Sequence, residues 1–109
     1  MELVLGNIFI RPNFLFKTGD KVDGHAHNFD HVTYVVRGKL KITRTKPTGE
    51  QRTIEVASTD NYPFVLIKAE DTHELSALVD DTVFHCIYAH NTPNGDVVQE
   101  YTGWDTAYQ

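Results

Sequence analysis

The sequence predicts an all-β protein, a β-sandwich or a barrel, and three observations support that class. Short runs of β-branched and aromatic residues recur along the chain, many with alternating apolar and polar positions. Turn residues separate these runs at intervals of about 8–12 residues, as they do in sandwiches and barrels. No segment of ten or more residues shows a helical period, and the best helical candidate, residues 70–78, is short and ends in β-type sequence.

Eight segments are expected to form strands, each bounded by turn residues. The expected strands occupy residues 2–10, 13–17, 31–38, 39–45, 52–57, 63–68, 73–79 and 82–90. Strands 39–45 and 52–57 are expected to pair as an exposed hairpin, because the segment between them carries Pro47, Thr48 and Gly49. The alternation of lysine and threonine with apolar residues along 39–45 predicts that one face of this hairpin is solvated.

Length and charge exclude several classes of protein. At 109 residues the chain is expected to form one domain. A formal charge of −5 with scattered basic residues argues against nucleic-acid binding. No apolar run approaches the roughly 20 residues of a membrane helix, and Glu2 stands where a signal peptide would be basic. Cys86 is the single cysteine, so no internal disulfide is expected and a cytoplasmic location is the default.

A cluster of three histidines is the most informative feature of the sequence. His25, His27 and His31 fall within seven residues, in the segment GHAHNFDH. His25 and His27 leave the same face if the segment is a strand. His31 joins them either by continuing that strand or by returning from the next one after a turn at Asn28–Asp30. A polar, histidine-rich loop is the competing interpretation, but three converging imidazoles supply most of the donors that a divalent cation needs.

The spacing of these residues resembles the first motif of the cupin superfamily. The match is Gly19-x5-His25-x-His27-x3-His31-x6-Gly38, with His31 where most metal-binding cupins have glutamate. The second cupin motif, Gly-x5-Pro-x-Gly-x2-His-x3-Asn, is degraded. If its histidine is set on His73, then the positions of the proline, the second glycine and the asparagine hold Lys68, Glu70 and Ala77. The departure from motif two weakens the assignment of His73 more than that of the first three histidines.

The resemblance implies a cupin-type jelly roll with a metal ion inside. The motif-bearing barrel would cover roughly residues 14–90, flanked by the N-terminal strand 2–10 and a tail, 91–109, whose aromatic residues are expected to dock on the barrel or on a partner. The implied ligands of one divalent transition metal are His25, His27, His31 and His73. Pairing of single-domain cupins through their sheets implies a homodimer.

The His-for-Glu change has a chemical consequence. Four neutral imidazoles leave the charge of the ion uncompensated, so the site is expected to act as a stronger Lewis acid and to prefer an anionic small-molecule ligand. The donor set favours Fe(II), with manganese, nickel, copper or zinc as alternatives. The leading hypothesis is a dioxygenase-like oxidoreductase acting on a small enolisable or diol-type compound. The alternatives are a metal-dependent lyase or isomerase, and a non-catalytic module that binds a metal or a small ligand.

Two further residues are candidates for contact with the substrate. Tyr34, three residues after His31, could donate a hydrogen bond to a bound ligand, and His85 could orient it. The sequence does not decide which face of the expected strand 82–90 points inward, because both alternating sets of side chains are largely apolar. Either the row of His85 or the row of Cys86 and Tyr88 lines the interior.

Overall fold

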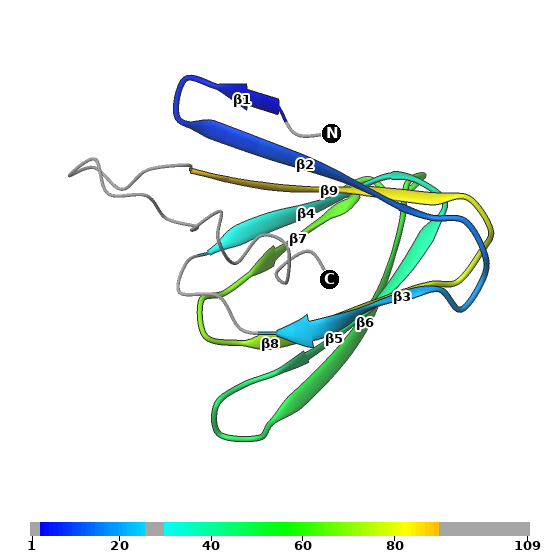
Figure 1. The fold of residues 1–109 in the computed structure, drawn as a ribbon. Helices are drawn as coiled ribbons and strands as arrows, with labels where there is room; N and C mark the ends of the chain where they lie inside the picture. Colours follow the sequence, from blue (N-terminus) through cyan, green and yellow to red (C-terminus); the bar gives the residue numbers. More distant parts are fainter. Residues whose placement is uncertain (1–2, 26–29, 90–109) are drawn as a thin grey trace.

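The structure, a computed structural model, confirms the all-β class. It describes residues 3–25 and 30–89, and at 23–25 the backbone alone. The described residues form two antiparallel sheets that face each other (Figure 1). The strands are β1 (Leu3–Leu5), β2 (Ile8–Leu15), β3 (Lys21–His25), β4 (His31–Arg37), β5 (Lys39–Thr45), β6 (Gln51–Ala57), β7 (Phe64–Ile67), β8 (Thr72–Ala77) and β9 (Thr82–Ala89).

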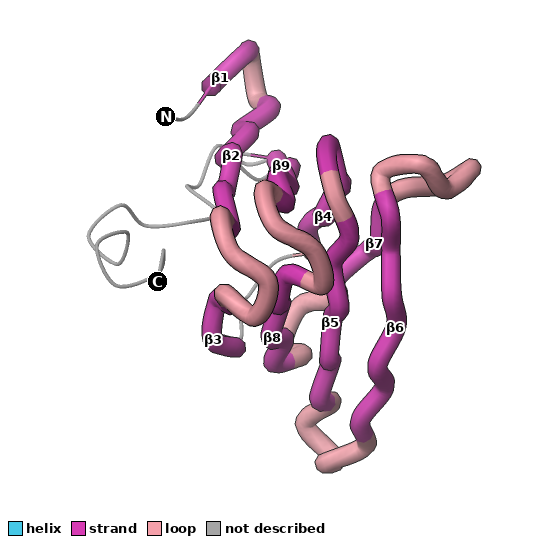
Figure 2. The backbone as a smooth tube through the Cα atoms, turned by 90° about the vertical axis from the view of Figure 1, so that its right-hand side faces the viewer, coloured by secondary structure: helices cyan, strands magenta, loops and turns pink. Residues whose placement is uncertain are grey.

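The strand order makes neighbours of segments that are distant in sequence. One sheet has the order β1-β2-β9-β4-β7 and the other β3-β8-β5-β6, and Figure 2 shows these strands in a view turned by 90° from that of Figure 1. The last strand, β9, therefore lies between β2 and β4. Similarly, β8 lies between β3 and β5. Of these two central strands, β8 carries His73, and β9 lies next to β4, which carries His31.

The core fills the space between the two sheets. It is formed by Leu15, Val35, Leu40, Ile42, Val56, Ile67, Leu75, Ala77 and Phe84. Leu40 and Ile42 are fully buried and alternate with the more exposed Lys41, as the period of a strand requires. Burial of each such side chain contributes about 1.5–3 kcal/mol to the stability of the fold.

Six of the eight expected strands are present with ends within two residues of the expected ones, but the N-terminal region differs. The expected strand 2–10 is divided by a turn at Gly6, which has a φ of +59°. The expected gap between strands 2–10 and 13–17 is wrong, since β2 continues through Arg11 and Pro12. β1 pairs only with Ile8–Ile10, so Pro12 lies where β2 has a neighbour on one side alone, and proline is tolerated at such an edge.

Strand β3 is present in addition to the strands that the sequence predicts. The predicted hairpin is confirmed. Residues Lys21–His25 have little β propensity, and their strand arises from pairing with β8. The β5–β6 hairpin has Thr45 opposite Gln51 as its last pair. At its tip the Gly49 N–H donates to the Lys46 carbonyl at 2.8 Å.

Gly38 joins β4 to β5 where the chain passes close to the start of β9. Its φ is +84°, and a Cβ atom added there would lie 2.5 Å from the Thr82 Oγ1 and 2.9 Å from the Thr82 Cα. Thr82 is fully buried, and its hydroxyl donates to the Val79 carbonyl at 2.9 Å. The close approach therefore requires the absence of a side chain at position 38. None of the described segments is a helix that could cross a lipid bilayer.

Candidate metal centre

His31 and His73 meet inside the sandwich. In β4, His31 alternates with outward-facing residues, and in β8, His73 lies in the inward row of Leu75 and Ala77. Each histidine is only 4% exposed. The centroids of the two imidazole rings are 5.1 Å apart and the ring planes are inclined by 59°. Because β4 and β8 belong to different sheets, the two rings touch across the interior.

The sheet register adds His25 to this neighbourhood. After an irregularity in the pairing beyond Val22, the β3 backbone at His25 lies directly opposite His73. The side chain of His25 and the whole of His27 lie outside the described residues. Among the side chains that are described, no group of three or more His, Cys, Asp or Glu could hold a metal ion. The ligand role of the four histidines therefore stays a prediction.

The described pair fits a transition-metal ion in its chemistry. Imidazole nitrogen is a preferred donor for iron, nickel, copper and zinc. His31 and His73 are buried, come from two rigid strands, and lie close enough to share one ion after small rotations of the rings. Apolar residues of the core, such as Ile67 and Leu75, adjoin them on the same strand faces and would keep bulk water away from a bound ion.

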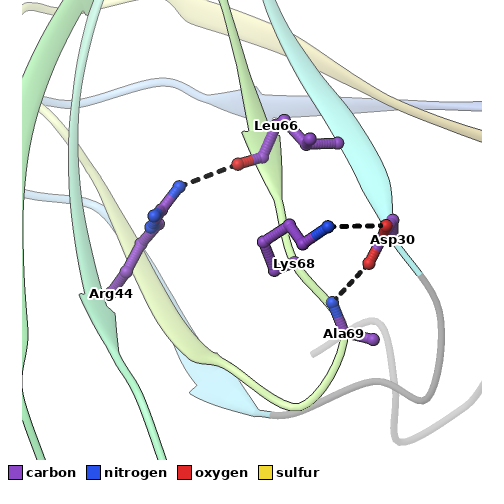
Figure 3. A network of polar contacts seen from close by, with 5 residues as sticks. All are labelled: Asp30, Arg44, Leu66, Lys68 and Ala69. Atoms are coloured by element: carbon purple, nitrogen blue, oxygen red, sulfur yellow. Dashed lines mark hydrogen bonds and ion pairs between the residues drawn. The ribbon is translucent and has the colours of Figure 1, made fainter.

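A polar network lies where the chain enters the two strands that carry these histidines (Figure 3). Asp30, which precedes His31, accepts a hydrogen bond from the Ala69 N–H at 2.7 Å and lies 3.3 Å from the Lys68 ammonium. In β7, two residues before Lys68, the Leu66 carbonyl accepts a hydrogen bond from the Arg44 guanidinium at 2.8 Å. The hydrogen bond from Ala69, followed by that from Lys68, lowers the pKa of the Asp30 carboxyl. The network fixes the entry to β4 against the loop that leads into β8.

Removing the Asp30 carboxylate is expected to weaken metal binding without unfolding the protein. In Asp30→Ala the loop at Ala69 loses its anchor, and we expect about a tenfold rise in the metal dissociation constant, the lower end of the range for lost supporting contacts. Calorimetric titration with Zn²⁺ measures the effect. The matched control is Asp60→Ala, which removes a similar bond from the Ala57 N–H (2.9 Å) far from the histidines. Equal metal affinity in the two variants would contradict this role for Asp30.

Tyr34 and His85 lie away from the His31–His73 contact. The β4–β9 register places them directly opposite each other. Tyr34 is 40% exposed and alternates with the buried Thr33 and Val35, so it projects from the outer face of the sheet, where its ring stacks on that of Phe64. The structure thus separates both residues from the His31–His73 contact, and the substrate-orienting role expected for them has no support from their position.

The interior row of β9 is that of Phe84, Cys86 and Tyr88, which resolves the alternative left open by the sequence. Phe84 is part of the core and Cys86 packs against it. Tyr88 is 7% exposed and stacks on Phe9 with ring centroids 5.0 Å apart. Burial raises the pKa of the Cys86 thiol to about 11, although the nearby Arg11 and the Thr33 hydroxyl act in the opposite direction. The thiol is therefore an inert part of the wall.

Cys86 is expected to resist alkylation in the folded protein. With a pKa near 11 against an ordinary value of 9.0, the thiolate fraction at pH 8 falls by about 100-fold, so reaction with iodoacetamide should be at least that much slower than in urea. The raised pKa also predicts a stability contribution that is complete below pH 9 and is lost as the pH rises towards 11, because the unfolded thiol ionises first. Urea unfolding of wild type and Cys86→Ala across this range measures the difference. Parallel pH profiles would contradict it.

Arg11 is an interior residue that the sequence alone does not mark as functional. In β2 it lies opposite Cys86, and its guanidinium carbon is 6.0 Å from the centroid of the Phe9 ring. The Nε and Nη2 atoms are buried. Arg11 shares one face of β2 with Phe9, Asn13 and Leu15. This alternation is missed when residues 11–12 are expected to lie between two strands.

Comparison with known proteins identifies the fold. No protein-family model and no curated protein matches the chain. Among solved structures, a cupin superfamily protein from Desulfitobacterium hafniense DCB-2 is similar with a TM-score of 0.65 at 16% sequence identity, over 82% of this chain and 73% of that chain. A cupin-2 domain containing protein from Shewanella frigidimarina NCIMB 400 gives a TM-score of 0.61 at 15% identity, over 80% and 74% of the two chains. The chain has the cupin fold.

A larger cupin-fold protein is also similar. A variant of oxalate decarboxylase from Bacillus subtilis gives a TM-score of 0.70 at 16% identity, over 88% of this chain and 23% of that chain. The present chain thus spans about a quarter of that protein. These likenesses confirm the fold that the spacing of the first motif implies.

Proposed function

We propose that the protein is a metal-binding cupin in which His25, His27, His31 and His73 hold one divalent transition metal, with Fe(II) favoured. The observation that carries the proposal is the contact between His31 and His73 at 5.1 Å across the two sheets. The backbone register of His25 opposite His73 supports it, since it brings the first histidine segment next to the strand of His73.

The reaction favoured by this donor set is dioxygenase-like turnover of a small enolisable or diol-type compound. When bound, an ion held by four imidazoles would supply Lewis-acid and redox chemistry at its remaining coordination positions. The chain itself would orient the ligand and exclude water. The inward row of β9, from Phe84 to Tyr88, and the core residue Ile67 form an apolar wall suited to that task.

The proposal is tested in two steps. Elemental analysis of protein purified without an affinity tag should give about one transition-metal ion per chain, and its identity decides between redox and Lewis-acid chemistry. Oxygen uptake by the iron-loaded protein is then measured against β-diketones, catechols and flavonols. Less than a tenth of an ion per chain after metal loading would overturn the metal proposal, and absence of uptake across the panel would overturn the dioxygenase assignment.

A lyase or isomerase reaction that needs no dioxygen is the second candidate. It is favoured by the buried Arg11 guanidinium, which suits a substrate that carries negative charge throughout the reaction. The likeness to oxalate decarboxylase is compatible with it. Turnover under anaerobic conditions distinguishes this reaction from the first. A third outcome, ligand binding with no turnover in either atmosphere, would identify a binding module.

We also propose that two copies pair through the outer face of the β1-β2-β9-β4-β7 sheet. The outward positions of β2, β7 and β9 hold no Asp, Glu, Lys or Arg. Exposed apolar side chains on this face include Leu3, Leu5, Ile8, Phe14, Tyr34, Phe64 and Leu66. The face is apolar apart from Arg37 at the end of β4, opposite Val83, so it is complementary to a second apolar sheet, and another copy of this chain supplies one. Sedimentation should give a dimer at micromolar concentration, and Phe64→Asp should give a monomer. A monomeric wild type would overturn this.

A further inference from the structure

Two cations in the inward rows of the described strands lie near the candidate metal centre. Arg44 lies opposite His73 and donates to the Leu66 carbonyl, and Arg11 has buried Nε and Nη2 atoms. The Arg11 guanidinium lies over the Phe9 ring, and Phe9 stacks on Tyr88. The β4–β9 register pairs Val32 with Ile87, so the next residue on each strand, His31 and Tyr88, lie at the same level. The series of contacts from Arg11 through Phe9 to Tyr88 therefore ends at the level of the His31–His73 pair.

We propose that Arg11 binds the carboxylate of a small organic acid. A different oxygen of that acid, from an enolate, a hydroxyl or a second carboxylate, would reach the metal. This inference rests on the proposed function and names its ligand class. A guanidinium presents N–H donors in a planar fork that matches the two oxygens of a carboxylate, and such charge-assisted pairs are stronger than neutral hydrogen bonds. The buried setting of the Arg11 nitrogens strengthens the attraction further, because solvent screening is weak there.

The dimensions of the interior limit the ligand to a few carbon atoms. β2 and β4 flank β9, so their backbones are about 10 Å apart, and the inward side chains narrow that gap. A short acid with an enolate, hydroxyl or second carboxylate oxygen spans from a guanidinium on β2 to an ion held by β4 and β8. Tyr88, between them, brings a phenol that can donate a hydrogen bond to such a ligand.

The charge balance of the site agrees with an anionic ligand. A divalent ion held by imidazoles alone keeps both of its positive charges. Within the described part of the interior, Asp71 is the buried carboxylate, and it lies in the loop before β8. A dicarboxylate or an enolised oxo acid would neutralise most of this charge on binding, whereas a neutral diol would not.

The test compares malonate with malonamide, a neutral molecule of similar size. Calorimetry on metal-loaded protein at fixed ionic strength should show that Arg11→Met raises the malonate dissociation constant by about 10- to 100-fold and leaves malonamide unaffected. Arg11→Lys, which keeps the charge but loses the fork, should fall between the two. The matched control is Arg52→Met, which removes the same charge from the exposed strand β6. Equal malonate affinity in Arg11→Met and Arg52→Met overturns the proposal.

Two further measurements keep the result interpretable. If Arg11→Met does not fold, as judged by circular dichroism, the Arg11 Nε–Hε resonance of the wild type decides: malonate should shift it and malonamide should not, and an unmoved signal overturns the proposal. Protein treated with a chelator distinguishes failure of the metal proposal from failure of the Arg11 proposal. If the metal proposal is wrong, treated and untreated proteins bind malonate equally and both depend on Arg11. If Arg11 is not the carboxylate site, metal stoichiometry persists and the dependence on Arg11 is absent.

Discussion

Replacing His73 by alanine is expected to abolish stoichiometric metal binding while the fold persists. Loss of a supporting contact around a metal ligand already costs about 10- to 100-fold in affinity, so loss of a ligand should cost at least the upper end of that range. The variant should lose its ion on dialysis, as measured by elemental analysis. The matched control is His85→Ala, which removes an imidazole from the outer face of the other sheet and should keep one ion per chain.

The same experiment has a readout in thermal stability. A ligand at 1,000 times its dissociation constant stabilises the native state by about 4 kcal/mol, which for a domain of this size raises the melting temperature by on the order of 15 °C or more. Wild type and His85→Ala should show this rise on addition of metal, and His73→Ala should not. If His73→Ala retained both the ion and the rise, the assignment of His73 as a ligand would be wrong.

Replacing Gly38 by alanine is expected to destabilise the protein more than alanine at any other described glycine with a left-handed φ. The residue would keep its φ of +84°, and its new methyl group would meet the buried Thr82 at 2.5 Å from Oγ1 and 2.9 Å from Cα. Backbone strain and overpacking each cost about 1–3 kcal/mol, so we expect a loss of roughly 2–6 kcal/mol in the free energy of unfolding. Urea unfolding measures it.

Gly49→Ala separates the two causes. Gly49 has a similar φ of +94° at the tip of the β5–β6 hairpin, but no atom lies within 4 Å of an added Cβ. The loss of unfolding free energy in Gly49→Ala should therefore reflect backbone strain alone and be close to 1 kcal/mol. If Gly38→Ala cost no more than Gly49→Ala, the packing of β4 and β5 against the start of β9 would be looser than the structure indicates.

The sequence predicts the strands that carry their own periodicity and misses those that depend on pairing. Strands β4, β5 and β9 have alternating or continuous β-branched and aromatic residues, and the structure has them nearly to the predicted residue. β3 has no such pattern, and its strand conformation comes from its neighbour β8. Pro12 suggests a break in β2 when only its neighbours in sequence are known. The tolerance of an edge for proline depends on how far β1 extends, which is not a local property.

The candidate site is predictable to the extent that it follows a linear spacing. The spacing of motif one and the single histidine of motif two lead to His31 and His73, which the fold brings into contact. The orientation of β9 is not predictable, because Val83 and Ile87 in one row are as apolar as Phe84 and Tyr88 in the other. Only the stacking of the second sheet decides which row is covered. For this reason the sequence leaves the position of His85 open, whereas Arg11 is missed because residues 11–12 are expected to separate two strands.

The strand order has a consequence for how copies of this chain can associate. The outermost strands of the larger sheet, β1 and β7, have only three and four residues. Those of the smaller sheet are β3, which has five residues, and β6, which carries Arg52 and Glu55. Short or charged rims offer little main chain for another molecule to extend the ladder. Uncontrolled growth into fibrils is thereby disfavoured even though the molecule displays much apolar surface, and contacts between chains are directed towards stacking of whole sheets.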